Sequence, residues 1–154
     1  MPAVFSFFSK PENLRLLTPG NMGFEILTPS PIGMKEGALV DYVVRIAGLP
    51  VRWTSMITCY EPPSRFVDLQ LKGPYAYWHH AHTFSGTDDG TVIVDEVHYG
   101  LPFGVLGRCI HALFVKRQLE FIFARRAYLI ERIFSETEAA GTQHGTRPKE
   151  VLTP

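Results

Sequence analysis

The hydrophobic period of the sequence changes once, near residue 101, and this change limits the possible folds more than any other feature. Before it, apolar and polar residues alternate in six segments, as in strands with one buried face; they span residues 24–28, 39–47, 51–60, 66–71, 77–84 and 91–101. After it, apolar residues recur at spacings near 3.6 as far as residue 134, which predicts one amphipathic helix. With about 30 residues, this helix would be roughly 45 Å long and would cross a whole sheet.

The order of these elements predicts an α+β domain. Short helical patterns over residues 2–8 and 14–17 come first, the six strands follow as an antiparallel meander, and the long helix comes last. Such a sheet buries one face by packing it against helices. A length of 154 residues suits one domain, which we place at residues 1–134. Residues 135–154 are polar and rich in Gly, Thr and Glu, so we expect a disordered tail there.

Composition and charge exclude several classes of protein. Lys and Arg together number 15, and so do Asp and Glu, so no net charge favours nucleic acid as a partner. No apolar run approaches the roughly 18 residues of a membrane span, and the first residues lack the pattern of a signal peptide. Cys59 and Cys109 are too few for a disulfide framework. We therefore expect a cytoplasmic protein with ordinary thiols.

Ionisable side chains gather on one face of the predicted sheet. Alternation along three neighbouring strands places them on the face that also carries aromatic residues; they are Asp68, Gln70, His80, His82 and Asp95. A buried polar group without a partner is costly, so we expect these side chains to contact one another.

Three hypotheses explain this group. It can be a hydrogen-bond network that fixes strand register, with Asp68 and Asp95 setting the histidine tautomers. It can be a polar patch that orients the carbonyl or hydroxyl of a ligand in an apolar cavity. It can also supply acid–base catalysis through His80 or His82, held by a carboxylate such as Asp95. Catalysis also requires a reacting atom within hydrogen-bond reach, so we favour the first two hypotheses, which are compatible.

Metal and cofactor sites have weaker support in the sequence. His80 and His82 could ligate zinc together with Asp68 or Asp95, but His79 belongs to the opposite face of the strand. Paired histidines on a strand are more often hydrogen-bonded or exposed, so we predict no metal site. The chain has no Gly-x-Gly-x-x-Gly or P-loop spacing and no Gly-x-Ser-x-Gly motif, so we predict no cofactor.

Several segments resemble a known superfamily over residues 1–134. They read FSFFSKPENL at residues 5–14, GLPVRW at 48–53, EPP at 61–63, FVDLQLKGPY at 66–75, WHHAHTF at 78–84 and LPFG at 101–104. Together they resemble the START-like or Bet v1-like (SRPBCC) superfamily, in its bacterial branch of polyketide-cyclase-like and coenzyme Q-binding-like domains. The resemblance implies a helix-grip fold, in which a curved sheet wraps around the long helix and leaves an apolar cavity.

The resemblance also implies a function. We expect this domain to bind a lipid, a quinone or a polyketide-like molecule, as a carrier or sensor. Its apolar wall would include Tyr42, Trp53, Phe66, Trp78, Phe84, Val97 and Tyr99, with Phe114, Phe121 and Tyr128 of the helix closing the cavity. The ionisable residues named above would orient the polar end of the ligand. The alternatives are a cyclase or dehydratase with His80 or His82 as the base, and a protein-interaction module.

One departure from the superfamily concerns the first strand. Members usually begin with a strand of about ten residues before the first helix, whereas only residues 1–3 precede it here. We expect either an upstream start, which we favour, or a six-stranded sheet whose exposed edge a homodimer would cover.

The long helix suggests a second partner. Its basic residues outnumber the acidic residues Glu120 and Glu131, and we expect them on a solvated face that could contact a membrane surface; they are Arg108, Lys116, Arg117, Arg125, Arg126 and Arg132.

Overall fold

The computed structural model describes residues 1–18, 20–46, 48–88, 90–102, 104, 114–139 and 145–153. Arg108, Cys109 and Ile110 lie outside these ranges. Cys59 is a free, half-buried thiol. No helix among the described residues is long and apolar enough to cross a membrane.

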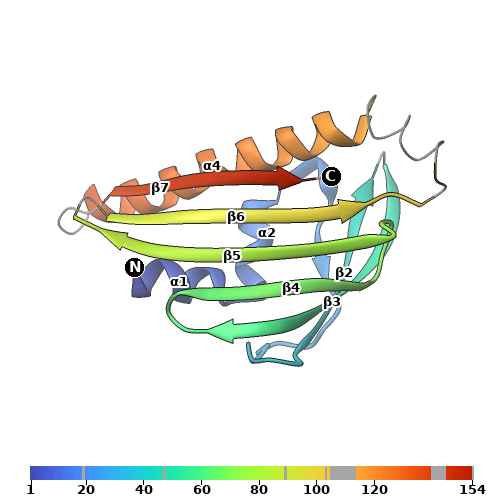
Figure 1. The fold of residues 1–154 in the computed structure, drawn as a ribbon, viewed down its shortest axis with the longest axis horizontal. Helices are drawn as coiled ribbons and strands as arrows, with labels where there is room; N and C mark the ends of the chain where they lie inside the picture. The colour runs from blue at the N-terminus through green and yellow to red at the C-terminus, as the bar shows by residue number, and fades with distance from the viewer. Residues whose placement is uncertain are drawn as a thin grey trace.

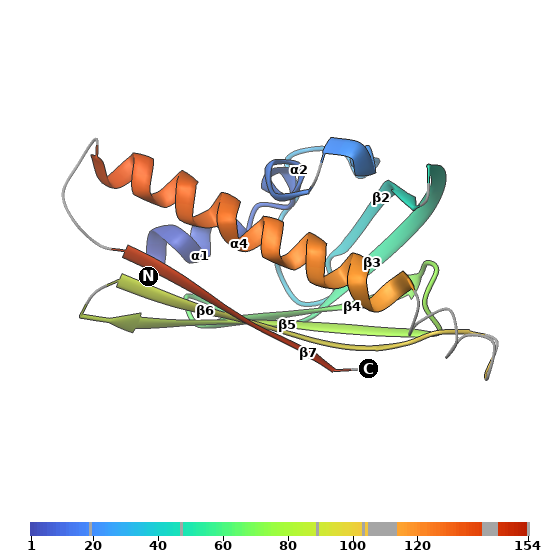
Figure 2. The same cartoon turned by 90° about the horizontal axis from the view of Figure 1, so that it is seen from above.

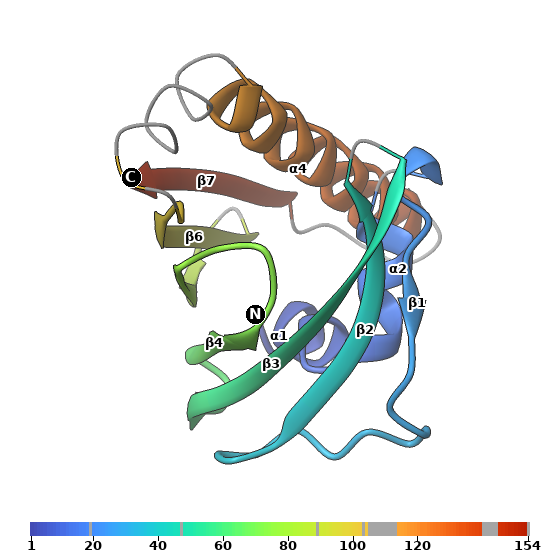
Figure 3. The ribbon, with the colours of Figure 1, turned by 90° about the vertical axis from the view of Figure 1, so that its right-hand side faces the viewer.

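The six predicted strands form an antiparallel meander (Figure 1), which confirms the predicted fold class. They are β1 (Glu25–Ile26), β2 (Leu39–Ile46), β3 (Leu49–Glu61), β4 (Arg65–Lys72), β5 (Tyr77–Thr87) and β6 (Gly90–Gly100). The register of β3 against β4 shifts twice, between Thr54 and Ser55 and between Ile57 and Cys59. Such irregularities bend a sheet, and Figure 3 shows β2 and β3 curling away from the other strands.

The helices lie on the inner side of this curved sheet (Figures 2 and 3). They are α1 (Pro2–Phe8), α2 (Leu14–Leu17) and the long α4 (Lys116–Ala139), with the 3₁₀ turns η1 (Pro11–Asn13) and η2 (Gly20–Met22) between α1 and the first strand. Pro2 opens α1 in the first turn, where its missing N–H costs nothing. This is the helix-grip arrangement that the sequence predicts.

A seventh strand, β7 (Gly145–Thr153), corrects two expectations about the end of the chain. It pairs in parallel with β6, from Gly90 opposite Gly145 to His98 opposite Thr153. The prediction of a disordered tail is therefore wrong for residues 135–139, which end α4, and for residues 145–153. The edge of β6, which a six-stranded sheet would expose, is covered over residues 90–98. Backbone N–H and C=O groups make these ladder bonds, so a polar sequence can form them.

The core consists of two hydrophobic clusters on either side of the buried histidines. The first joins α1 and α2 to the sheet and to the later part of α4, and contains Val4, Phe5, Phe8, Leu17, Phe66, Phe84, Ile93 and Ile130. The second joins the other end of the sheet to the first turns of α4, and contains Val44, Trp53, Trp78, Val97, Tyr99, Leu119 and Phe123.

The rotational phase of α4 differs from the prediction. The relative exposure of Phe114 is 68%, that of Phe121 is 59% and that of Tyr128 is 47%, so these residues do not close a cavity. Leu119, Phe123 and Ile130 are buried instead. Both sets recur at helical spacing, and spacing alone does not say which of two apolar stripes faces the sheet.

The phase of α4 makes a testable prediction about stability. Ile130→Ala should lower the free energy of unfolding by about 2 to 5 kcal/mol, because it removes a fully buried side chain and leaves a cavity. Phe121→Ala on the exposed face should change it by no more than about 0.5 kcal/mol. Urea unfolding followed by circular dichroism measures both, and equal losses would contradict this phase.

Candidate functional site

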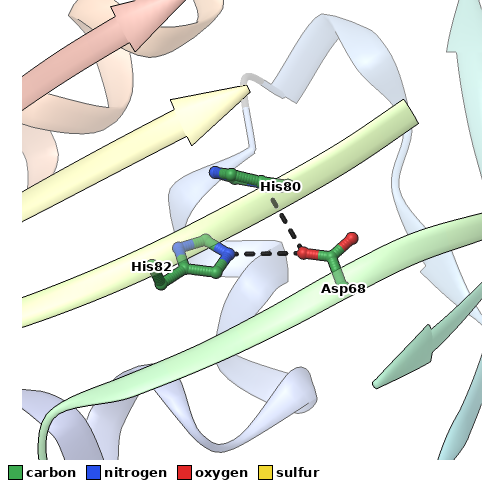
Figure 4. A group of neighbouring side chains, drawn as sticks. All are labelled: Asp68, His80 and His82. Atoms are coloured by element: carbon green, nitrogen blue, oxygen red, sulfur yellow. Dashed lines mark hydrogen bonds and ion pairs between the residues drawn. The ribbon is translucent and has the colours of Figure 1, made fainter. Parts of the chain in front are cut away.

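Strand register brings four ionisable side chains together, as the alternation predicts. Asp68 on β4 lies opposite His80 on β5, and His82 on β5 lies opposite Asp95 on β6. His80 and His82 are two residues apart, so both point to the inner face of the sheet. Figure 4 shows both imidazoles beside the Asp68 carboxylate. His80, His82 and Asp95 are buried, and Asp68 is half-buried.

Both imidazoles lie between the same two carboxylates. His82 Nδ1 is 2.5 Å from Asp95 Oδ1, and His82 Nε2 is 3.3 Å from Asp68 Oδ2. His80 Nδ1 is 3.6 Å from Asp68 Oδ2, and His80 Nε2 is 3.4 Å from Asp95 Oδ1. The latter contact lacks hydrogen-bond geometry, so His80 Nε2 has no hydrogen-bond partner among the described residues. The two ring centroids are 3.8 Å apart.

Arg126 of α4 adds a cation to this group. Its Nε lies 3.8 Å from Asp95 Oδ2, and its guanidinium lies over the Phe8 ring, 5.2 Å from the centroid. Only 8% of the residue is exposed. The expectation that Arg126 belongs to the solvated basic face of the helix is therefore wrong. Its charge faces inward because Asp95 needs a cation in a region from which water is largely excluded.

Burial and neighbouring charges shift the pKa of each member. Burial alone would raise the pKa of Asp95, but the charges of Arg126 and His82 hold it well below its usual range. Burial likewise opposes ionisation of Asp68, yet the hydrogen bond from His82 and the nearby histidine charges lower its pKa. Despite burial, the charge of Asp95 and the contacts with both carboxylates raise the pKa of His82.

His80 differs from His82 in its protonation. Burial and the charge of His82 lower the pKa of His80 to about 4. His80 is therefore the neutral imidazole at neutral pH, whereas the raised pKa of His82 favours its charged form beside the two carboxylates. A proton on His80 would add a buried charge next to that of His82.

A pocket of about 220 Å³ lies beside this group, between the sheet and the helices. Seven of the predicted ligand-binding residues line it: Tyr42, Trp53, Phe66, Asp68, Trp78, His80 and His82. Helix α4 contributes Leu119, Ile122 and Phe123 instead of the expected Phe114 and Phe121. The wall is thus mainly apolar and aromatic, with the charged group at one side.

The other predicted residues of the sheet do not line this pocket. Asp95 lies behind the histidines, and Phe84, Val97 and Tyr99 are buried within the core clusters. Gln70 holds the turn after β4: its Nε2 donates to Tyr75 O at 2.8 Å, and its Oε1 accepts from Tyr75 N at 3.4 Å. This places Tyr75 against Trp53 and Trp78, with centroids 5.6 and 4.7 Å away.

Sequence reasoning missed several polar or aromatic residues of the pocket, among them Ser55, Tyr75 and Arg126. Ser55 Oγ accepts from Trp53 Nε1 at 3.2 Å and donates to Asp68 Oδ1 at 3.4 Å. The period of two along β3 would have identified it, since it lies between Trp53 and Ile57 on the same face. Tyr75 lies in a turn, where alternation gives no signal.

One group of three side chains among the described residues could hold a metal ion, and it consists of Asp68, His80 and His82. One ligand atom from each residue lies within 4.8 Å of the other two. The same group offers a ligand both hydrogen-bond donors and acceptors. These two possibilities follow from the same geometry.

Comparisons with known proteins support the fold. A scan against protein-family models and a search of curated proteins both find no match. Among solved structures, protein Ms6760 from Mycobacterium smegmatis is similar at a TM-score of 0.60 and 14% identity, over 88% of this chain and 84% of that one. TTHA0849 from Thermus thermophilus is similar at a TM-score of 0.60 and 16% identity, over 87% and 89% of the two chains. At these identities the likeness shows the fold alone.

Two adjacent arginines test the buried charge pair. Arg126→Met should lower the free energy of unfolding by about 3 kcal/mol, because it leaves Asp95 without its helix cation. Arg125→Met, next to it on the exposed face, should cost no more than about 0.5 kcal/mol. Urea unfolding measures both variants, and similar values for the two would contradict a buried pair.

The pKa of His80 predicts how stability depends on pH. A group whose pKa is lower in the folded state stabilises it fully above the unfolded value of 6.5, and this contribution is lost as pH falls toward about 4. His82, with its raised pKa, has the opposite effect above pH 6.5. We therefore expect the free energy of unfolding, measured with a chelator present, to decrease from about pH 6.5 to 4.5.

A pair of variants isolates this effect. His80→Asn should flatten the decrease, whereas His98→Asn should keep it, because the His98 side chain is 42% exposed and pairs with Glu96 outside the buried group. An equal slope in His80→Asn and the unmodified protein would show that His80 is not the group responsible.

Proposed function

We propose that this protein binds a compact hydrophobic small molecule in the pocket between the sheet and α4, as a carrier or sensor. The observation that carries this proposal is a mainly apolar pocket with one charged, hydrogen-bonding wall. Binding sites for small molecules usually combine these two features, because apolar contact supplies affinity and a few polar groups fix orientation.

The size of the pocket narrows the ligand class. A cavity of about 150 Å³ accepts one benzene ring, and pockets for drug-sized ligands span about 300 to 1,000 Å³. A pocket of about 220 Å³ therefore suits a molecule with one or two rings. This favours a quinone head group or a small polyketide-like aromatic over a lipid, whose acyl chain would extend beyond the pocket.

The charged wall supports a particular orientation. His80 and Arg126 line the pocket, and His80 Nε2 and Arg126 Nε lack hydrogen-bond partners among the described residues. Both atoms lie near Asp95, and a ligand carbonyl or hydroxyl at this wall would hydrogen-bond with the side chains of His80 and Arg126 that line the pocket. The rings of Tyr42, Trp53 and Trp78 would then contact the apolar part of the ligand.

Membership of the START-like superfamily remains part of the proposal. The helix-grip fold and the pocket on its inner face support it. A cyclase or dehydratase activity is the second candidate, since His80 and His82 line the pocket. Binding is favoured, because a base with a pKa of about 4 is weak at neutral pH and both nitrogens of His82 face carboxylates.

We also propose a cytoplasmic location and a peripheral contact with a membrane. The contact would be made by the exposed face of α4. The exposed face of α4 carries Phe121 and Tyr128 among basic residues, and the guanidinium carbons of Arg125 and Arg132 lie 5.2 and 6.0 Å from the Tyr128 ring centroid. Aromatic and basic residues on one helix face suit the surface of an anionic membrane. A charge-reversal variant that tests this membrane contact should keep Arg126, because that residue is buried.

Two adjacent residues of α4 test ligand binding. Ile122→Trp should weaken binding of menadione, a two-ring quinone, by at least about tenfold, because the larger side chain fills part of the pocket. Phe121→Trp should leave the affinity within about twofold, because Phe121 is exposed. Calorimetry measures both variants, and quenching of Trp53 and Trp78 fluorescence provides a second measurement for the unmodified protein.

The contrast between the variants decides the outcome. Saturable binding that only Ile122→Trp weakens would support the pocket. Quenching without saturation, or equal losses in the two variants, would contradict it.

A further inference from the structure

We propose that Asp68, His80 and His82 bind one divalent transition-metal ion at the wall of the pocket, with Asp95 holding the imidazole of His82 from behind. The sequence alone favours a hydrogen-bond network here. It does not show which ring nitrogens face which carboxylates. The structure shows that arrangement, and the inference rests on it. It does not depend on the identity of the pocket ligand.

The first observation is the spacing of the ligand atoms. Asp68 Oδ2 is 3.3 Å from His82 Nε2 and 3.6 Å from His80 Nδ1. Around a tetrahedral ion with bonds of about 2.0 to 2.2 Å, ligand atoms are about 3.3 to 3.6 Å apart. Both distances therefore match two edges of such a tetrahedron, and all three ligand atoms lie within 4.8 Å of one another.

The second observation is the position of Asp95 on the far side of both rings. Its Oδ1 is 2.5 Å from His82 Nδ1 and 3.4 Å from His80 Nε2. His82 thus has one nitrogen toward Asp68 and the other hydrogen-bonded to Asp95, whereas His80 Nε2 lies near Asp95 without hydrogen-bond geometry. Metal-bound histidines almost always donate their second N–H to a carboxylate, a backbone carbonyl or water, which fixes the tautomer that binds the metal.

The third observation concerns charge. Arg126 Nε lies 3.8 Å from Asp95 Oδ2, so the Asp95 carboxylate has its own counter-ion. Asp68 therefore remains available as the anionic ligand of the metal. The ion would replace any proton on His82 Nε2, because a histidine binds metal in its neutral form. Neutral imidazoles and one carboxylate are suitable ligands for Zn²⁺, Co²⁺ and Fe²⁺, whereas Ca²⁺ and Mg²⁺ prefer oxygen ligands alone.

The fourth observation is the pocket itself. Asp68, His80 and His82 all line it, so an ion held by these three residues has at least one further coordination position open to the pocket. Structural zinc sites have four protein ligands, whereas sites that bind substrate or water have three. The geometry thus points to a site that can take an oxygen atom from water or from a bound molecule.

Titration with Co²⁺ tests this inference directly. Protein stripped with a chelator should bind one Co²⁺ per chain, with the visible absorption of a four- or five-coordinate ion. Asp68→Asn and His82→Asn should each weaken binding by at least about 100-fold, and Asp95→Asn by about 10- to 100-fold. His98→Asn, at an exposed histidine–glutamate pair, should leave affinity within about twofold.

Two results would overturn the inference. One is the absence of saturable one-to-one binding to the unmodified protein. The other is equal weakening by His82→Asn and His98→Asn. If the buried variants do not fold, the unmodified protein still decides, because Co²⁺ should broaden the NMR signals of residues 68, 80 and 82 before those of residue 98. Broadening centred elsewhere would contradict the proposed site.

Discussion

The structure depends on neutralising two carboxylates inside an aromatic core. Asp95 is buried and Asp68 lies beside it across β5, and an unpaired charge in such a place costs several kcal/mol. Arg126 supplies a compensating charge to Asp95, and His82, whose pKa is raised, lies between the two carboxylates. This requirement constrains the fold, because a slip of one residue in β5 would turn both histidines to the outer face. It also constrains the phase of α4, which must turn Arg126 toward the sheet.

The same cluster accounts for the pocket beside it. Apolar residues pack in two groups on either side of the histidines, and aromatic rings of both groups contact the imidazoles: the Phe66 centroid is 4.2 Å from that of His82, and the Phe123 centroid is 5.6 Å from that of His80. Strands β2 and β3 curl away from the other strands (Figure 3) and contribute Tyr42 and Trp53 to the lining of the pocket. The pocket thus combines this aromatic wall with the charged wall formed by Asp68, His80 and His82. An apolar wall with one charged side supports the proposed binding of a small hydrophobic ligand that has a polar group at one end.

The strands and their faces were predictable from sequence, whereas the helix phase and the last strand were not. Alternation has a period of two, so it assigns Asp68, His80, His82 and Asp95 to one face without ambiguity. Helix α4 carries a second apolar stripe through Phe121 and Tyr128, but the orientation that buries Leu119, Phe123 and Ile130 also brings Arg126 to Asp95. Arginine is seldom buried, so Arg126 could be found only from its partner. Strand β7 pairs through its backbone, and its polar composition gives no signal of this.

The most direct test of the account is native mass spectrometry of the protein purified from its own host. The account predicts an intact mass above that of the chain by one compact hydrophobic molecule, a quinone or polyketide-like aromatic that organic extraction then identifies. A chain that carries nothing, and that also binds no member of a panel of quinones, polyketide-like aromatics and lipids, would contradict the proposed function.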